Sequence, residues 1–414
     1  MSAADRTDGP YAILRNRNYL LYLIGRFIAS VGNQMLTVAV GWELYERTGS
    51  ALALGFVGLA QILPMFLFTL PAGHWADHHP RKRIMVWMTG VHMVSSLGLS
   101  FVSAFDAPVF WMYVFLFVAG TARTFFWPAS ASFLPQLVGP VDFPRAVAWS
   151  TGSFHLSSVA GPAIAGAWLA WSHRAADIYT FNVGATLVCL VLVNLVHCRE
   201  TPTPRQPMTL KSLVTGFQFV WGSRIILGTI TLDLFAVLLG GATALLPIYA
   251  KDILRAGPSG LGYLQAALPL GSLVSSLVMA HRAPMERAGR ALLWSVAIYG
   301  AATIVFGFSK TLWLAWLALF VCGLADNVSV IIRHTLVQML TPDEKRGRVS
   351  AVNSLFIGTS NELGGFESGF VAHHFGPVFA AVSGGAGTIL VVIAIAWIWP
   401  EIRRYGRLSP PRQD

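Results

Sequence analysis

The sequence predicts an all-α membrane protein with twelve transmembrane helices in two pseudo-symmetric six-helix halves. Of its 414 residues, 55% are hydrophobic and only 12% are charged. A helix needs about 20 apolar residues to cross a bilayer, and twelve stretches meet that need. They cover approximately residues 18–44, 52–76, 84–104, 109–134, 145–171, 176–197, 225–250, 258–281, 291–309, 312–334, 348–373 and 377–399. Little of the chain is left over for a soluble domain.

The stretch 73–83, GHWADHHPRKR, is a short polar hinge between the second and third of these runs. Arg81, Lys82 and Arg83 stand behind one acid, Asp77. Cytoplasmic loops carry an excess of Lys and Arg, so the hinge predicts the cytoplasmic side and, by counting spans, cytoplasmic termini. The outside loops then hold few cations, namely Arg47, Arg174, Lys251, Arg255 and Lys310. The net charge of +10 is therefore a topology signal that requires no nucleic acid as a partner.

A polar segment interrupts the series of apolar runs near its middle. Residues 198–207, CRETPTPRQP, have the prolines and charges of a linker. Apolar residues then recur at helical spacing over 210–217, which predicts an amphipathic helix at the membrane surface rather than a span. We expect an N-terminal six-helix half at 1–197, a cytoplasmic linker at 198–223, a C-terminal six-helix half at 224–400 and a cytoplasmic tail at 401–414.

Short internal repeats support this division. LFVAG at 116–120 recurs as LFVCG at 319–323, an offset of 203 residues. Trp87 corresponds to Trp294 at an offset of 207 residues. The second copy of the hinge, at 280–290, keeps cations but has a proline where the first copy has its acid.

Charged side chains occur deep inside several predicted spans, where insertion costs about 3 kcal/mol unless the charge meets a partner or water. The repeat offsets map Arg26 onto Asp233 and Arg123 onto Asp326. Opposite charges thus stand at equivalent places in the two halves. A cavity between the halves would have a cationic wall and an anionic wall.

Two interpretations of these charges remain open. In the first, Asp233, Asp326 and Glu362 bind a coupling proton, and the two arginines contact anionic parts of a substrate. Glu367 adds an acid at similar depth. Poor hydration favours a protonated carboxylate and a nearby Arg opposes it, so substrate entry can displace a proton. In the second, the charges form fixed ion pairs that hold helices together. Arg333 is expected near the cytoplasmic end of its span, with its side chain snorkelling to the surface.

The hinge pattern Gly73-x-x-x-Asp77-His78-x-x-Arg81-Lys82 resembles the loop between helices 2 and 3 of the major facilitator superfamily of transporters. The resemblance implies that Gly73 allows close helix approach, and that the acid and the cations hold an inward gate shut. His78 stands where the family usually has Arg or Lys, which makes that position weaker or pH-dependent. The alternative is a basic loop that serves only topology. The resemblance also implies a site between two six-helix halves near mid-membrane.

A second motif, Gly161-Pro162-x-x-Ala165-Gly166, resembles the helix-5 motif of the superfamily's exporters, which normally reads Gly-Pro-x-x-Gly-Gly. Pro removes a backbone hydrogen bond, and small residues allow close helix contact. The resemblance implies a bend that can seal one face of an exporter. Ala165 departs from the family pattern, and a small-residue packing face is an equal alternative.

Three further stretches, 26–30, 210–217 and 262–271, are similar to the enterobactin-exporter branch of the superfamily, which includes macrolide-efflux relatives. The resemblance implies a secondary active exporter in the bacterial inner membrane. Such an exporter moves a small amphipathic, siderophore-like compound out of the cytoplasm by alternating access, with a proton as coupling ion and no other cofactor. A multidrug or macrolide efflux antiporter is the alternative within transport. A non-transporting membrane receptor or sensor is the alternative from another class.

No constellation in the sequence favours catalysis or metal binding. Walker-type phosphate loops, the G-x-S-x-G elbow and haem or zinc spacings are absent from the sequence, so we expect no enzyme. His74, His78 and His79 of the hinge have no carboxylate or Cys beyond Asp77 to complete a metal site, and Cys189, Cys198 and Cys322 show no paired spacing. The expected partners are the lipid bilayer and a small-molecule substrate, and we expect a monomer.

Overall fold

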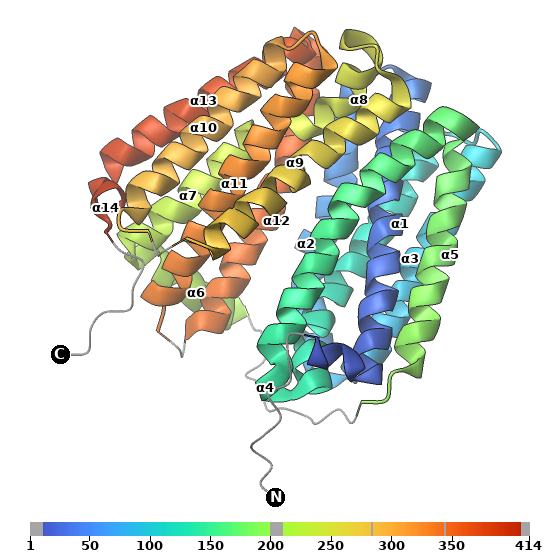
Figure 1. Ribbon diagram of the computed structural model, residues 1–414, viewed down its shortest axis with the longest axis horizontal. Helices are drawn as coiled ribbons and strands as arrows, with labels where there is room; N and C mark the ends of the chain where they lie inside the picture. The colour runs from blue at the N-terminus through green and yellow to red at the C-terminus, as the bar shows by residue number, and fades with distance from the viewer. Residues whose placement is uncertain (1–10, 199–209, 283–284, 343–344, 407–414) are drawn as a thin grey trace, which may run out of the picture. The chain divides into compact units, whose positions relative to one another are not determined.

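The computed structural model describes residues 11–198, 210–282, 285–342 and 345–406. These residues form helices joined by short turns, with no β-strand among them (Figure 1). Helices are expected because a backbone in hydrocarbon must satisfy its hydrogen bonds within the segment. The predicted all-α membrane fold is confirmed.

The longer helices follow the predicted apolar runs in order. Their bounds are α1 (Arg17–Thr48), α2 (Ala51–His78), α3 (Arg81–Ala104), α4 (Phe110–Ser172), α5 (Ala175–Leu195), α6 (Leu210–Gly222), α7 (Arg224–Leu239), α9 (Gly257–Ala280), α10 (Ala288–Phe308), α11 (Leu312–Leu340), α12 (Arg346–Phe375) and α13 (Pro377–Ile398). Two short helices, η1 (Ala12–Arg15) and α14 (Pro400–Arg404), precede α1 and follow α13.

Ten helical segments in the described ranges are long and apolar enough to span a membrane. The part of α4 after Gly139 and the whole of α12 are not among them. α12 has the length of a span, but Asn353, Asn361, Glu362 and Glu367 make it polar. The count of twelve spans therefore stays a prediction.

α4 joins two predicted spans, 109–134 and 145–171, with a break at Gly139. Gly139 has φ +74° and ψ 169°, a backbone conformation that strongly favours glycine because it has no Cβ. Pro140 follows, and a proline disfavours helical geometry at the residue before it. The chain therefore turns between two helical segments with almost no loop.

The predicted span 225–250 is interrupted after α7. Three short segments continue it, namely η2 (Ala242–Leu245), α8 (Leu246–Ile248) and the π-helical η3 (Tyr249–Ile253). Gly240 and Gly241 stand at the break, and Tyr299 of α10 donates a hydrogen bond to the Gly240 carbonyl at 3.0 Å. Discontinuous membrane helices often line binding sites, so the side chains around this break are candidates for a binding site.

The described helices group into two compact units. Unit 1 comprises Met1–Thr37, Leu63–Gly161 and Arg174–Pro207, and unit 2 comprises Val38–Ile62, Pro162–His173 and Met208–Asp414. In unit 1, α3 packs along α5 (Figure 1). In unit 2, α11 packs against both α9 and α10, and α10 packs along α13. Helices α1, α2 and α4 contribute residues to both units.

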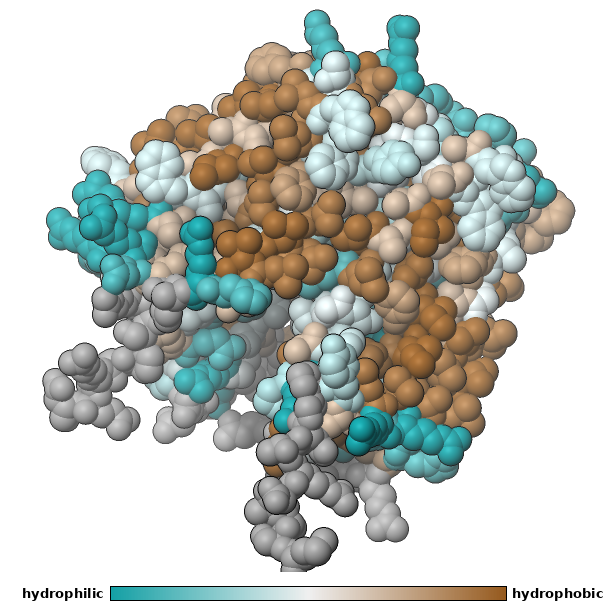
Figure 2. Space-filling view, viewed as in Figure 1, coloured by the Kyte–Doolittle hydropathy of each residue, from teal (hydrophilic) through white to brown (hydrophobic). Residues whose placement is uncertain are grey.

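Each unit has an apolar core of its own. Buried side chains in unit 1 include Tyr19, Met85 and Phe133, and those in unit 2 include Leu292 and Ile332. The outer sides of the helices are apolar as well. On the face shown in Figure 2, hydrophobic residues run along the helices and hydrophilic residues gather mainly at helix ends. Apolar residues both inside and outside a helix bundle are typical of a membrane protein.

α6 packs against α12 in unit 2. The ring of Phe217 stacks on Trp221 of α6 and on Phe356 of α12, with centroid distances of 5.9 and 6.0 Å. With 13 residues, α6 is too short to cross a bilayer. It is therefore an accessory helix of unit 2 and not a span.

We expect the contact between α9 and α11 to be sensitive to added volume. A Cβ at Gly323 would run into the carbonyl of Leu268, so Gly323→Ala should push these helices apart. Overpacking of this kind costs about 1–3 kcal/mol, which should lower the midpoint of thermal unfolding in detergent. Gly184→Ala is the matched control, because no described atom would lie within 4 Å of its new Cβ. Equal midpoints for the two variants would contradict the close approach.

Candidate functional site

Three helices of unit 2 carry polar side chains to one place in an otherwise apolar bundle. Asp233 lies on α7, Tyr299 on α10, and Asp326, Ser329 and Arg333 lie on α11. The three α11 residues are spaced i, i+3 and i+7, which places them on one face of that helix. Because α11 packs against both α7 and α10, this face meets the other two helices.

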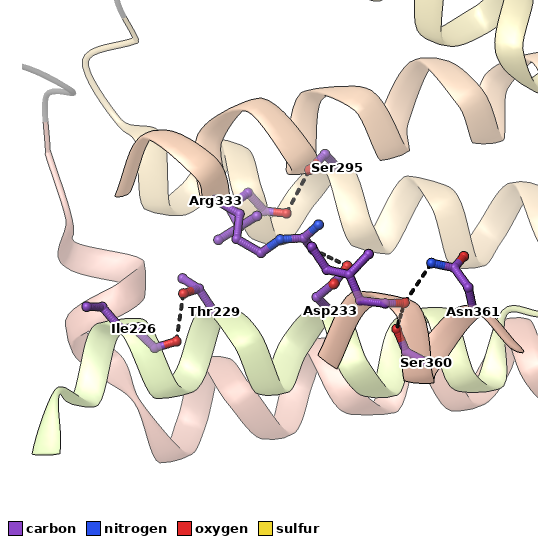
Figure 3. A network of polar contacts seen from close by, with 9 residues as sticks. Ile226, Thr229, Asp233, Ser295, Arg333, Ser360 and Asn361 are labelled. Atoms are coloured by element: carbon purple, nitrogen blue, oxygen red, sulfur yellow. Dashed lines mark hydrogen bonds and ion pairs between the residues drawn. The ribbon is translucent and has the colours of Figure 1, made fainter. Parts of the chain in front are cut away.

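Arg333 and Asp233 form an ion pair between α11 and α7 (Figure 3). Their side chains are 4% and 7% exposed. Side chains on a helix lean toward its N-terminus, so Arg333 reaches back along α11 toward the level of Asp326. Burial of either charge alone would cost on the order of several kcal/mol, and pairing offsets that cost.

A small cavity of about 10 Å³ lies beside this ion pair. Its lining comprises Asp233, Ala236, Val237, Val296, Tyr299, Asp326 and Ser329. The volume admits about one water molecule, which needs polar partners of this kind. Asp326 is half-buried, lies within electrostatic range of Arg333, and has no ion-pair or hydrogen-bond partner among the described residues. One acid of the site thus has a fixed partner and the other has none there.

Figure 3 also shows four hydroxyl and amide groups that hydrogen-bond within their own helices. Thr229 of α7 and Ser295 of α10 each donate to a carbonyl about one turn earlier, at 2.9 and 2.8 Å. Ser360 and Asn361 of α12 share one such carbonyl, at 3.0 and 2.8 Å. These groups therefore do not compete with Arg333 for its acid.

Arg26 and Arg123 lie in unit 1, on α1 and α4. The guanidinium carbon of Arg26 lies 4.6 Å from the ring centroid of Phe126, a geometry in which a cation is attracted to the ring face. Arg123 is exposed and within electrostatic range of His92 on α3. Arg26 makes no ion pair within the described part of the chain.

Glu362 and Glu367 lie half-buried on α12, and neither belongs to the lining of the small cavity. The hydroxyl of Ser368 donates to the Glu367 carboxylate at 3.4 Å. The backbone carbonyl of Glu362 lies close to Gly58 of α2, where an added Cβ would collide with it. A role of these two acids in coupling stays a prediction.

The hinge residues end α2 and begin α3. Arg81 is buried at the start of α3, and Lys82 lies beside it. The ammonium of Lys82 donates to the carbonyls of Asn194 and Val196, at 2.8 Å each, so it satisfies acceptors at the C-terminal end of α5. The side chain of Asp77 lies outside the described residues, and its role as the gate acid stays a prediction.

The second predicted gate motif lies within α4, which stays helical through Pro162. A Cβ added to Gly161 would lie 2.6 Å from the Cβ of Gln34, so α4 and α1 touch there. The carbonyl of Pro162 lies against Gly262 of α9. Gly73 of the hinge is buried in the final turns of α2. The predicted gate roles of the two motifs stay predictions.

Within unit 2, the ends of α1, α2 and α4 pack on helices from the second half of the chain. The hydroxyl of Tyr45 donates to the carboxylate of Asp252 in η3, and the ammonium of Lys251 lies 5.7 Å from the Tyr45 ring centroid. A Cβ added to Gly369 of α12 would lie 2.7 Å from the Cα of Gly55 in α2. Together with the α4–α9 contact, these interactions join the two halves of the sequence at one end of unit 2.

The expectation that Arg333 snorkels to the surface is wrong. Its side chain is buried and paired with Asp233. The two depths agree, because Asp233 lies about 13 Å from the start of α7 and Arg333 about 11 Å from the end of α11 at about 1.5 Å per residue. In an up-and-down bundle these two helix ends lie on the same side. Comparison of these depths is the signal that could identify the pair from sequence.

Membrane-length helices that bury an ion pair beside an acid-lined cavity define a multi-pass membrane protein with a polar site inside the bilayer, an arrangement that marks substrate and ion pathways. A family model described as Major Facilitator Superfamily matches residues 22–360. This match covers most of the chain, so the chain belongs to the Major Facilitator Superfamily and is a membrane transporter. The family predicted from the hinge motif is confirmed.

Relatives with assigned names lie in the predicted branch. The chain is 26% identical over 397 residues to Enterobactin exporter EntS of Shigella flexneri, with 94% of this chain and 93% of that protein covered. It is 26% identical over 395 residues to Enterobactin exporter EntS of Escherichia coli O1:K1 / APEC, with the same shares covered. The resemblance to the enterobactin-exporter branch is confirmed.

Solved structures share the fold at lower identity. The nucleoside transporter NupG has a TM-score of 0.69 and 13% identity, with 94% of this chain and 99% of that chain covered. A bacterial homologue of the iron transporter ferroportin in an inward-facing state has a TM-score of 0.68 and 18% identity, with 93% and 99% covered. These identities show the fold alone. The family and the fold are those of transporters, which are not enzymes.

Loss of one partner of the buried ion pair should destabilise the protein far more than loss of both. Arg333→Gln leaves Asp233 as an uncompensated buried charge, and Asp233→Asn leaves Arg333 in that position. Each single variant should lose about 3–5 kcal/mol of stability. The double variant should recover most of that loss, as measured by the midpoint of thermal unfolding in detergent.

The control for these single and double variants is an exposed ion pair. Arg224 contacts Glu401 at 3.0 Å, and its side chain is 78% exposed, so Arg224→Gln should leave the midpoint unchanged. If the double variant at the buried pair is as unstable as the sum of its singles, the two charges do not stabilise each other.

The hydrogen bond between Tyr45 and Asp252 should hold α1 against η3. Tyr45→Phe removes the bond and keeps the ring beneath Lys251, so the contact should open about ten-fold more often, as expected for about 1.5 kcal/mol in a hydrogen bond to a charged group. The readout is the alkylation rate of a cysteine placed at position 366. The ring of Phe366 in α12 contacts the ring of Phe56 in α2.

The matched control for this readout is Tyr263→Phe. Tyr263 is an exposed tyrosine of unit 2 with no hydrogen bond from its hydroxyl among the described residues. All variants are made in a background without the native cysteines. An alkylation rate that is the same with and without the Tyr45 hydroxyl would rule out a holding role for this bond.

Proposed function

We propose that this protein is a secondary active exporter that moves a small amphipathic, siderophore-like compound out of the cytoplasm by alternating access, with a proton as coupling ion. The observation that carries the proposal is the cavity of unit 2, where Arg333 holds Asp233 and leaves Asp326 without a fixed partner among the described residues. The export direction and the cargo class are supported by the relatives, which are enterobactin exporters by name.

Asp326 is the proposed proton carrier. A cavity of about 10 Å³ holds too little water to solvate a carboxylate well, and binding of a proton removes the cost of the bare charge. Arg333 opposes this, because a nearby cation stabilises the ionised form. A movement of Arg333 from Asp233 toward Asp326 would therefore expel the proton. Substrate binding that favours this movement would couple the two fluxes.

The contacts at one end of unit 2 support alternating access. They join α1, α2 and α4 from the proposed N-terminal half (1–197) to η3, α12 and α9 from the proposed C-terminal half (224–400). In the proposed cycle these contacts break when the cargo site closes to one side of the membrane and opens to the other. The linker (198–223) keeps the halves connected. A single hydrogen bond and close backbone contacts of this kind can open without unfolding either core.

Arg26 and Arg123 support an anionic cargo. Arg26 on the face of Phe126 offers a positive charge next to a flat apolar surface, which suits an anionic compound with ring-shaped apolar parts. A multidrug or macrolide efflux antiporter is the alternative. Transport of cationic drugs in place of anionic compounds would distinguish it from a siderophore exporter.

We place the protein in the bacterial inner membrane with both termini in the cytoplasm. The basic hinge supports this orientation, and the named relatives are bacterial. We propose a monomer, because each unit has its own apolar core. A non-transporting receptor or sensor is the rival class, and membership of a transporter family favours transport.

Asp326→Asn should separate exchange from proton-driven transport. An amide at this position cannot carry a proton, so the variant should exchange labelled enterobactin at equilibrium and show no response to an imposed pH gradient. The wild-type protein in the same proteoliposomes should accumulate enterobactin against its concentration gradient. The measurement is labelled enterobactin retained per vesicle with and without the pH gradient.

Glu401→Gln is the control, because Glu401 is an acid in an exposed ion pair on α14. Gradient-driven accumulation by Asp326→Asn at the wild-type rate would remove Asp326 from the coupling site. The same vesicles are tested with a cationic drug. Movement of the drug without movement of enterobactin would support the multidrug alternative, and movement of neither would support a receptor.

A further inference from the structure

An open groove of about 550 Å³ lies in unit 1 where α3 begins and α5 ends. It is separate from the acid-lined cavity of unit 2. Its lining residues are Pro80, Lys82, Arg83, Val86, Trp87, Asn194 and Cys198. Two of the seven are cations and none is an acid, so the groove attracts anions.

The charged end of the groove is held in place. The ammonium of Lys82 is fixed by its bonds to the carbonyls of Asn194 and Val196, at 2.8 Å each. Arg83, the next residue, is exposed. An exposed Arg guanidinium binds phosphate oxygens through charge-assisted hydrogen bonds, and the fixed Lys82 charge beside it adds attraction for an anion.

The other end of the groove is apolar. Val86 and Trp87 follow Arg83 by about one turn of α3, and Trp87 is 70% exposed. Tryptophan is enriched at the depth of lipid headgroups, where one side of the ring is wet and the other is apolar. The groove therefore changes from cationic to apolar along α3, in the order in which a phospholipid changes from headgroup to acyl chain.

We propose that this groove binds an anionic phospholipid, with its phosphate on Arg83 next to the positive charge of Lys82 and the start of an acyl chain along Val86 and Trp87. Basic pockets between membrane helices are known to take anionic headgroups. The occupant is a lipid rather than a soluble anion because the apolar end of the groove offers no polar group to a free phosphate. The proposal is independent of the direction and the cargo of transport.

The equivalent position in unit 2 shows how the chain itself supplies hydrogen-bond acceptors there. At the offset of 207 residues, Lys82 corresponds to Gly289 at the start of α10. There the amides of Ala288 and Gly289 donate to the carbonyls of Gly406 and Tyr405, at 3.1 and 3.3 Å. A Cβ at Gly289 would collide with the carbonyl of Ile402 in α14. In unit 2 the segment 402–406 therefore occupies the position that corresponds to the groove. In unit 1 the carbonyls of Asn194 and Val196 take that role for Lys82, and Arg83 is an exposed cation of the groove.

The first test measures retention of phosphatidylglycerol by the full-length protein in native mass spectrometry. The wild-type protein should retain one molecule through detergent removal, and Arg83→Gln should lower its affinity about five-fold, as expected for one basic residue near an anionic headgroup. Zwitterionic phosphatidylethanolamine should be retained less than phosphatidylglycerol. Trp87→Leu keeps both cations and should also weaken retention, because it shortens the apolar end.

Arg290→Gln is the matched control. Arg290 precedes Trp294 by four residues, as Arg83 precedes Trp87, and both arginines are exposed. The control should retain lipid like the wild-type protein. Equal retention by Arg83→Gln and the wild-type protein, or equal loss in Arg83→Gln and Arg290→Gln, would overturn the proposal. Elution of each variant at the wild-type volume in size-exclusion chromatography verifies its fold.

A second test uses Cys198, which lines the groove, whereas Cys189 and Cys322 are buried. Maleimide should label Cys198 more slowly in nanodiscs that contain phosphatidylglycerol than in nanodiscs of phosphatidylcholine alone. Inorganic phosphate added to the latter should not slow the reaction. Protection by inorganic phosphate equal to that by phosphatidylglycerol would show a soluble-anion site and overturn the lipid assignment, as would a rate that is the same in both nanodiscs.

Discussion

The buried ion pair between Asp233 and Arg333 is the interaction on which the arrangement of unit 2 depends. Transfer of either charge from water into the bundle costs on the order of several kcal/mol, and the attraction between them offsets that cost only in a fixed geometry. α7 and α11 must therefore keep their relative depth. Among the residues that line the adjacent cavity, Asp326 is the other carboxylate. Arg333 thus has two acids within electrostatic range, and in the proposed cycle it moves from Asp233 toward Asp326.

Tyr299 connects this site to the break that follows α7. Its side chain lines the cavity, and its hydroxyl donates to the carbonyl of Gly240. Beyond Gly240 the chain continues through η2 and α8 to η3, where Asp252 accepts a hydrogen bond from Tyr45 of α1. Contiguous contacts and chain segments thus connect α10 and α7 to the place in unit 2 where the two halves of the sequence meet. Two discrete arrangements of such a network are what coupling between distant sites requires.

The positions of the helices follow from the sequence because an apolar run in hydrocarbon must form a helix whatever its neighbours do. Asp233 and Asp326 can be found in the same way, since an acid in such a run is costly and therefore conspicuous. Arg333 cannot be assigned so simply. A long side chain near a helix end can reach either the surface or the interior, and only the packing of α11 on α7 decides. The break at Gly240 cannot be predicted from the sequence for a similar reason, because a glycine in a membrane helix can equally well serve close packing.

The two halves use equivalent positions for different chemistry. Arg26 corresponds to Asp233, yet Asp233 is neutralised by Arg333, whereas Arg26 lies on Phe126 and makes no ion pair in the described structure. At the offset of 203 residues, Arg333 corresponds to Ser130, whose hydroxyl is 3.1 Å from that of a tyrosine in α1. The first half thus lacks the partner that the second half supplies to its acid. An uncompensated cation suits an anion. In the proposed function the first half of the sequence therefore contributes the cargo contact at Arg26, and the second half contributes the proton carrier at Asp326 beside the neutralised Asp233.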